Sequence, residues 1–189
     1  VRRDPERHIR YRGEAARVGQ TLVNEGTRLQ PGALALLASI GHTHPLVTRQ
    51  PITQHLATGD EIVPPDQNPG PGQVRDANST LVRAFLNRWD IAPFQSRIAE
   101  NTTRLTPAVA QADLLLISGG ASVGEYDCTR QLLADLGYTL RIAGTRTRPG
   151  KPLLLAENKG QLAFGLPGNP LSHFVCLHLY VRVALESWS

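Results

Sequence analysis

The sequence predicts a three-layer α/β/α fold with a mostly parallel sheet and helices on both of its faces. Short apolar, strand-like segments alternate with helical patterns along the 189-residue chain, and this alternation is typical of parallel sheets. Turns rich in glycine or acidic residues follow three of the strand-like segments. Because ligands bind outside the carboxyl ends of the strands in such sheets, these turns are the expected site.

The first elements follow from local patterns. Residues 1–28 are polar and weakly periodic, so we expect a connector or the remnant of a preceding domain there, and the α/β domain over residues 29–189. Pro31-Gly32 leads into a short apolar helix at residues 33–40, which ends at Gly41. The expected strands, of which the last two form a hairpin, span residues 52–58, 93–99, 113–118, 153–156 and 161–165.

Four further helices are expected. Asn78-Ser79 caps the first of them, whose apolar side chains lie between Leu81 and Trp89. The other three span residues 105–112, 129–136 and 171–185. The last of these is apolar almost all round, so we expect it to be buried or to face a partner chain.

The composition indicates neither a nucleic-acid partner nor a membrane partner. The formal net charge is +4, and arginines are densest before residue 18. No recognised nucleic-acid-binding motif accompanies them, so we interpret this region as a solvated segment or a surface for another domain. No run of 18 or more apolar residues occurs, so we expect no membrane span.

The first residues, the cysteines and the histidines indicate where the protein is located and whether it binds zinc. Residues 1–7 are charged and give no signal peptide, so we expect a cytoplasmic protein. Cys128 and Cys176 form no disulfide framework, and we expect small buried thiols in a reducing cytosol. The histidines show no ligand spacing beyond His42-x-His44, so no zinc site is expected. The chain has no methionine, and we expect a fragment, a processed chain or a trimmed form of a longer protein.

The turn after residues 113–118 is the strongest local signal for function. Residues Ser118–Asp127 read SGGASVGEYD and join an apolar strand to a helical pattern. Glycines let the backbone approach a ligand closely, and the start of a helix offers free N–H groups to an anion. A phosphate site needs the acids Glu125 and Asp127 only where a cation or a reacting group is also present. The turn therefore indicates an anionic, metal-assisted ligand.

Four weaker motifs each have a structural interpretation beside the functional one. Thr58–Glu61 (TGDE) and Asp76–Asn78 (DAN) are also typical of a turn residue or a helix cap. Arg148–Pro152 (RPGKP) is a solvated basic loop if it is isolated, and an oxyanion clamp if it lies beside an anion site. Gly165–Ser172 (GLPGNPLS) is a turn that presents polar donors, or else a plain start of a helix.

Together and in this order, the five motifs resemble the molybdopterin-binding domain of the MoeA family, the molybdopterin molybdenumtransferases, whose animal counterpart is the C-terminal part of gephyrin. The resemblance runs from about Ile9 to about Leu185, and Arg10–Glu14 is similar to a stretch that the family carries just before this domain. The family takes adenylylated molybdopterin and molybdate, and releases AMP with the finished cofactor. The resemblance therefore implies these small-molecule substrates and Mg²⁺ as the assisting ion.

The resemblance also implies roles for residues of this chain. A divalent ion that bridges phosphate oxygens needs hard oxygen ligands, and cations neutralise the oxyanions. The expected catalytic residues are Asp60, Asp127 and Lys151, and the expected metal ligands are Asp60, Glu61 and Glu125. The residues expected to bind pterin and phosphate are Thr58, Gly59, Asp76, Asn78, Ser118, Gly119, Gly120, Ser122, Gly124, Arg148, Gly150, Pro167, Gly168, Asn169 and Ser172.

The chain departs from the family pattern at several points. Ala15 follows Glu14 where the family usually has an acid, Arg148 stands where it often has lysine, and Ala77 replaces a residue with a hydroxyl. The family's full chain has two further domains before this region and a small β domain after it, and a partner subunit completes its active site. We therefore expect a homodimer, or partner domains outside this chain.

Two other functions remain open. The first is a non-catalytic molybdopterin-binding or scaffold module, which the missing domains and Ala15 favour and the intact TGDE and SGG motifs oppose. The second is a molybdopterin adenylyltransferase, although such proteins typically carry a TGG-TG loop in place of Ser118–Ser122.

Overall fold

The computed structural model describes residues 11–98, 109, 111–119 and 125–188. The chain divides into two compact units, one up to residue 48 and one over residues 49–188. In the first, the helix α1 (Pro31–Ser39) confirms the helix expected at residues 33–40. No residue of α1 is buried, and the compact α/β unit starts at residue 49.

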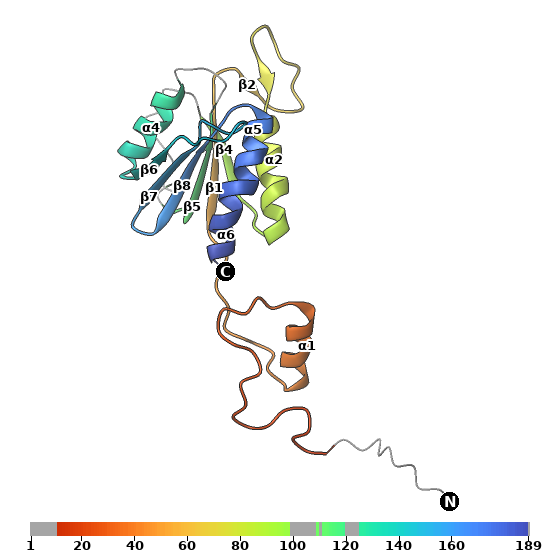
Figure 1. Ribbon diagram of the computed structural model, residues 1–189. Coiled ribbons are helices and arrows are strands. Elements are labelled where there is room, and N and C mark those ends of the chain that lie inside the picture. Colours follow the sequence, from red (N-terminus) through yellow and green to blue (C-terminus); the bar gives the residue numbers. More distant parts are fainter. Residues whose placement is uncertain (1–10, 99–108, 110, 120–124, 189) are drawn as a thin grey trace, which may run out of the picture. The chain divides into compact units, whose positions relative to one another are not determined.

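Six strands form the main sheet of the second unit (Figure 1). In spatial order they are β4 (Phe94–Ile98), β1 (Thr53–Thr58), β5 (Leu114–Ser118), β8 (Gln161–Leu166), β7 (Leu154–Asn158) and β6 (Thr139–Ala143). β1 pairs in parallel with β4 and β5, and β5 pairs in parallel with β8, whereas β7 is antiparallel to β8 and β6. The predicted, mostly parallel α/β sheet is confirmed, and so are the five expected strands.

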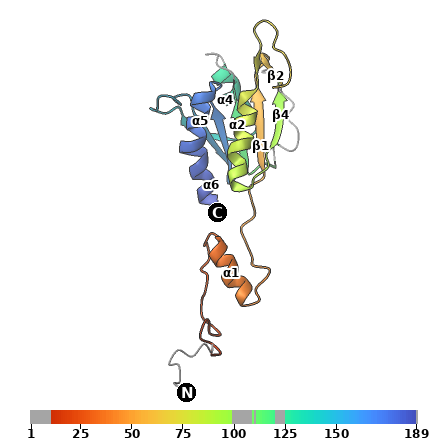
Figure 2. The ribbon, with the colours of Figure 1, turned by 90° about the vertical axis from the view of Figure 1, so that its right-hand side faces the viewer.

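Helices cover both faces of this sheet (Figures 1 and 2). The helical segments of one face are α2 (Ala77–Leu86), the 3₁₀ turn η1 (Asn87–Trp89) and the continuous run of α5 (Pro170–Cys176), the π-helical η2 (Leu177–Val181) and α6 (Arg182–Trp188). The other face carries α4 (Glu125–Asp135). The three-layer prediction is thereby confirmed.

Alternate residues of β5 face the two helical layers. Leu114 and Leu116 pack into the cluster that contains α2 and the α5–α6 run. Leu115 and Ile117 pack on the other face, in the cluster that contains Leu133 of α4. Both faces of the strand are buried, and this is why its sequence is a continuous apolar run rather than an alternating one.

Several sequence predictions about local structure are corrected. The N-cap of α2 is Asp76 and not Asn78-Ser79, because the Asp76 carboxylate accepts hydrogen bonds from the backbone N–H and the hydroxyl of Ser79. α4 starts at Glu125, earlier than expected, and β6 was not predicted because all of its residues are exposed. The helix expected at residues 105–112 lies largely outside the described residues. β2 (Ile62–Val63) and β3 (Val74–Arg75) form a separate small sheet.

The two cysteines differ from each other. Both are free thiols, as expected, but Cys128 is exposed, so the expectation that it is buried is wrong. Cys176 is buried between the α5–α6 run and the sheet, and burial raises the pKa of its thiol to about 11. Within the part of the chain that the structure describes, none of the helices is both long enough and apolar enough to cross a membrane.

Candidate functional site

Strand register brings the motif loops to one end of the sheet. Ala57 of β1 pairs with Ser118 of β5, and Ser118 pairs with Leu166 of β8. The loops that follow these strands therefore leave the sheet at the same level. Two hydrogen bonds tie them together, from the Thr58 hydroxyl to the carbonyl of Ser118 (3.1 Å) and from the N–H of Gly119 to the carbonyl of Leu166 (3.3 Å).

The RPGKP loop reaches the same end. β6 finishes at Ala143, which pairs with Leu154 at the start of β7, and Leu154 pairs with Gly165 near the end of β8. The loop between β6 and β7, residues 144–153, therefore lies beside the carboxyl ends of the parallel strands. This end of the sheet, with the loops that leave it, is called the carboxyl end below.

The TGDE turn after β1 presents two acids. Gly59 has φ +137°, and a Cβ there would lie 2.7 Å from a carboxylate oxygen of Glu61, so the position favours glycine. Asp60 is exposed and Glu61 is half-buried. Neither carboxylate has a hydrogen-bond or ion-pair partner among the described residues. Both are therefore available to a cation or a ligand.

The DAN motif is used mainly for structure. Asp76 is buried and its carboxylate caps α2, which is the structural interpretation of this motif. Asn78 lies in the first turn of α2, and its side-chain amide donates a hydrogen bond to the carbonyl of Gly168 (2.8 Å). This bond joins the start of α2 to the loop after β8. Asp76 and Asn78 thus fix the positions of two loops at the carboxyl end.

The start of α5 has a similar arrangement. The side-chain oxygen of Asn169 accepts hydrogen bonds from the N–H groups of Leu171 and Ser172, so Asn169 is the N-cap. The Asn169 amide nitrogen and the Ser172 hydroxyl have no partner among the described residues. These two groups remain available as polar contacts for a ligand.

A hydrogen-bond network runs from the exposed Arg83 of α2 through the half-buried Gln95 to the buried His55 and Ser118. Arg83 donates two hydrogen bonds to the side-chain oxygen of Gln95, which fixes the orientation of that amide. The Gln95 amide nitrogen therefore donates, both to the carbonyl of Ser79 (2.8 Å) and to Nδ1 of His55 (3.1 Å). Because Nδ1 of His55 accepts this hydrogen bond, Nε2 carries the proton. Nε2 therefore donates a hydrogen bond to the Ser118 hydroxyl at 2.7 Å.

A second buried histidine lies in the first turn of α5. His173 is fully buried, and its Nδ1 bonds to the carbonyl of Pro167 at 3.0 Å. A carbonyl can only accept, so Nδ1 carries the proton and Nε2 is left as an acceptor. Burial lowers the pKa of His55 to about 3 and the pKa of His173 to about 4, so both are neutral at physiological pH.

Two buried acceptors in this region have no donor among the described residues. They are Nε2 of His173 and the side-chain oxygen of Asn78. A buried polar atom without a partner is costly, by about 1–3 kcal/mol. A hydrogen-bond donor at each position would remove this cost.

The RPGKP loop combines a fixed backbone with exposed cations. Gly150 is buried with φ +107°, and a Cβ there would lie 3.1 Å from Sγ of Cys176, so only glycine fits without strain. Arg148 and Lys151 are exposed, and neither has an ion pair within the part of the chain that the structure describes. The loop thus presents positive charge at the carboxyl end, as the oxyanion-clamp interpretation requires.

The remaining predicted residues cannot be placed in this way. Gly120, Ser122 and Gly124 lie outside the described residues. Glu125 and Asp127 begin α4, but their side chains are also outside the description. Over residues 11–98, 109, 111–119 and 128–188, no group of three or more His, Cys, Asp or Glu side chains is arranged to hold a metal ion.

Sequence reasoning missed His55, His173 and Gln95. The histidines were considered only for metal-ligand spacing, which they do not show. His55 lies in a strand next to Leu56, and a polar residue inside a buried strand was the available signal. Its partner Gln95 comes from the neighbouring strand β4 and could be recognised only once the strand order was known.

Known proteins are similar to this chain in sequence and in fold. Residues 54–187 match a family described as a probable molybdopterin binding domain. The molybdopterin molybdenumtransferase of Bacillus subtilis is 32% identical over 186 residues, which cover 96% of this chain and 43% of that protein. The protein of the same name from Nostoc sp. is 34% identical over 190 residues, which cover 96% of this chain and 44% of that one.

A solved structure gives the same result. The molybdopterin biosynthesis MoeA protein from Pyrococcus horikoshii superposes with a TM-score of 0.75 at 29% identity, over 93% of this chain and 45% of that chain. This chain therefore spans less than half the length of the relatives that it matches.

Proposed function

Because this chain belongs to the family of molybdopterin-binding domains, we propose that the carboxyl end of its sheet binds molybdopterin and adenylylated molybdopterin. The observation that supports this most strongly is the gathering of four motif loops, TGDE, DAN, RPGKP and GLPGNPLS, at that end. They offer glycine turns, amide donors and exposed cations. This combination suits a ligand that joins an organic ring system to phosphates.

We also propose that the domain serves in a molybdopterin molybdenumtransferase, the name that its relatives carry, with molybdate as the second substrate and AMP as a product. Mg²⁺ is the proposed cofactor. Asp60 and Glu61 fit it, because Mg²⁺ binds through one or two carboxylates together with substrate phosphates. When bound, the ion neutralises charge on the phosphate oxygens. We also propose Glu125 as a metal ligand, and Asp127 and Lys151 as catalytic residues.

A homodimer in the cytoplasm completes the proposal. Its support is the exposed apolar surface of the last helical run, where four apolar side chains are about half exposed or more. They are Leu171 (65%), Phe174 (45%), Leu179 (48%) and Val183 (51%). Light scattering should give twice the mass of the chain for the wild type and the single mass for Phe174→Asp. Equal masses for the two proteins would contradict the dimer.

Calorimetric titration with adenylylated molybdopterin, with and without Mg²⁺, tests the binding function. We expect Mg²⁺ to tighten binding by the wild type but not by Asp60→Asn, whereas the exposed loop variant Asp66→Asn should behave as the wild type. Absence of binding by the folded chain would oppose the proposal and favour a scaffold role. In an assembly that also contains the regions that the relatives have beyond this chain, Asp60→Asn should abolish Mg²⁺-dependent release of AMP.

A further inference from the structure

The Ser118 hydroxyl lies at the end of a chain of hydrogen bonds whose direction is fixed along its whole length. The chain starts at the exposed Arg83 of α2 and crosses three neighbouring strands of the sheet, β4, β1 and β5. Ser118 itself is only 1% exposed. Because water has almost no access to Ser118, protein groups rather than solvent set the orientation of its hydroxyl.

Arg83 and Ser79 set the direction at the start of the chain. A guanidinium group only donates, and two bonds from Arg83 go to the side-chain oxygen of Gln95 (2.9 and 2.7 Å). On its other side the Gln95 amide faces the carbonyl of Ser79 (2.8 Å), which only accepts. These two independent contacts hold the amide in one orientation, with its N–H groups directed at Ser79 and at Nδ1 of His55.

His55 passes this direction on to Ser118. A charged imidazole would place an N–H group at Nδ1 against the N–H of Gln95, and burial lowers the pKa of His55 to about 3, so the ring is neutral and has one proton. With Nδ1 as the acceptor, this proton is on Nε2, and the Ser118 oxygen accepts it at 2.7 Å. The proton of the Ser118 hydroxyl itself is then left over, and it has no acceptor among the described residues.

Strand register indicates where this remaining proton points. His55 pairs with Leu116, which lies on the same face of β5 as Ser118 and two positions before it. His55 therefore approaches the hydroxyl from the direction of the amino end of the sheet. A hydroxyl oxygen that accepts a hydrogen bond from this side directs its own proton away from it. Ser118 is the last residue of β5, so the motif loops of the carboxyl end begin beside it.

We propose that Arg83, Gln95 and His55 are positioning residues that make the Ser118 hydroxyl a hydrogen-bond donor to the ligand. The ligand atom that meets Ser118 is then an acceptor, and an unprotonated phosphate oxygen fits this requirement. That the ligand is molybdopterin rests on the proposed function. The direction of the chain does not, because it depends only on the hydrogen bonds between its members.

NMR correlation of the imidazole nitrogens with their protons, in the full chain without ligand at neutral pH, tests the direction of the chain. The signals of His55 are identified by their loss in His55→Gln. We expect a neutral ring with its proton on Nε2. A proton on Nδ1, or a mixture of the two tautomers, would overturn the proposal. This measurement needs no ligand, so its result is independent of the proposed function.

Calorimetric titration with molybdopterin tests the effect on the ligand. Ser118→Ala and His55→Leu should each weaken binding about tenfold, as expected for the loss of a hydrogen bond to a charged group. His55→Gln should bind within about twofold of the wild type, because its amide both accepts from Gln95 and donates to Ser118. In the Ser118→Ala protein, His55→Leu should cause no further loss, since His55 acts only through Ser118.

Gln54→Leu is the matched control. Gln54 is buried beside His55 in β1, and its amide donates to Ser96 of β4, so the variant removes a buried contact between the same two strands and leaves the chain intact. It should bind as the wild type. If the wild type binds molybdopterin and His55→Leu binds it equally well, only the positioning role fails. If Nε2 carries the proton and molybdopterin does not bind, only the proposed function fails. The NMR result decides the direction of the chain even if His55→Leu does not fold.

Discussion

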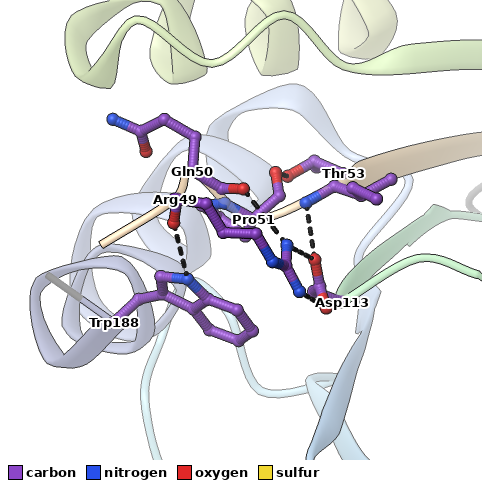
Figure 3. A network of polar contacts seen from close by, with 7 residues as sticks. Arg49, Gln50, Pro51, Thr53, Asp113 and Trp188 are labelled. Atoms are coloured by element: carbon purple, nitrogen blue, oxygen red, sulfur yellow. Dashed lines mark hydrogen bonds and ion pairs between the residues drawn. The ribbon is translucent and has the colours of Figure 1, made fainter. Parts of the chain in front are cut away.

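The two ends of the sheet differ in how their polar groups are partnered. At the amino end, Arg49 donates to both carboxylate oxygens of Asp113, one of them at 2.8 Å (Figure 3). The Ile52 N–H donates to the same carboxylate at 2.8 Å, and the Trp188 indole donates to the carbonyl of Arg49 at 3.2 Å. This network connects the starts of β1 and β5 to the end of α6.

At the carboxyl end, polar groups are left over. Arg146, Arg148 and Lys151 have no ion pair among the described residues, and His173 and Asn78 each keep a buried acceptor without a donor. The difference indicates that the two ends of the sheet have different roles. The network of Arg49, Asp113, Ile52 and Trp188 at the amino end is satisfied internally and contributes to stability, whereas the carboxyl end keeps exposed cations that a ligand can reach. Variants that change stability without changing ligand binding, or binding without stability, test whether the two ends have these separate roles.

The largest expected effect on stability is its loss in mild acid, which arises at the carboxyl end. The pKa values of His55 and His173 are about 3 and about 4 in the folded state, and near 6.5 in the unfolded chain. The unfolded state therefore takes up protons first, so stability is full above about pH 6.5 and falls as the pH decreases towards 4. Each histidine should contribute about 1.4 kcal/mol per pH unit.

Urea unfolding between pH 7.5 and 4.5 measures this slope. His55→Gln should reduce it by about half, because one of the two histidines no longer titrates. His42 is exposed, so His42→Gln should leave the slope as in the wild type. A stability that does not change over this pH range would contradict the burial of neutral histidines.

Gly150→Ala should also destabilise the protein from the carboxyl end. A Cβ at Gly150 lies 3.1 Å from Sγ of Cys176 and 3.2 Å from Oγ1 of Thr147, with φ +107°. We expect a loss of about 1–3 kcal/mol in the free energy of unfolding, and weaker ligand binding because the basic loop shifts. Gly160→Ala has a positive φ but open space around it, and should cost less. Equal costs would show that the contact with Cys176 is unimportant.

Asp113→Ala tests the amino end. The hydrogen bonds from Arg49, followed by that from Ile52, hold the pKa of Asp113 below its usual value, so the carboxylate is charged at neutral pH. Loss of the Ile52 bond should lower stability by about 1–2 kcal/mol, with ligand affinity unchanged. The surface ion pair between Arg141 and Glu157 provides a control. Glu157→Gln removes this pair and should lower stability by less than about 0.5 kcal/mol. A loss of affinity in Asp113→Ala would contradict the division between the two ends.

The smallest effect on stability is expected for the double variant Arg148→Gln, Lys151→Gln. Both side chains are exposed, so thermal unfolding should change by less than about 0.5 kcal/mol. Molybdopterin affinity should fall by about tenfold or more, because charge-assisted contacts are lost. Affinity equal to that of the wild type would show that the clamp is misplaced.

The sequence predicts the strands of this fold well where their burial is uniform. β5 is an unbroken apolar run, and the β7–β8 hairpin closes through Lys159 and Gly160, both with positive φ. β6 was missed because an exposed edge strand carries no hydrophobic pattern. Motif order predicts which loops meet at the carboxyl end, since parallel strands align their ends.

The histidine network could not be predicted from the sequence. His55 faces Ser118 and Gln95 only because β1 lies between β5 and β4, and this strand order is a tertiary property. The same applies to Asn78, whose partner Gly168 is ninety positions away in the chain.

Amide hydrogen exchange with and without saturating molybdopterin shows which residues of the chain the ligand contacts. We expect added protection at the carboxyl end, in residues 58–61, 144–151 and 166–172, and unchanged exchange at the amino end, in residues 49–53 and 111–114. Protection at the amino end alone, or no change anywhere in a chain that is saturated with ligand, would contradict the account.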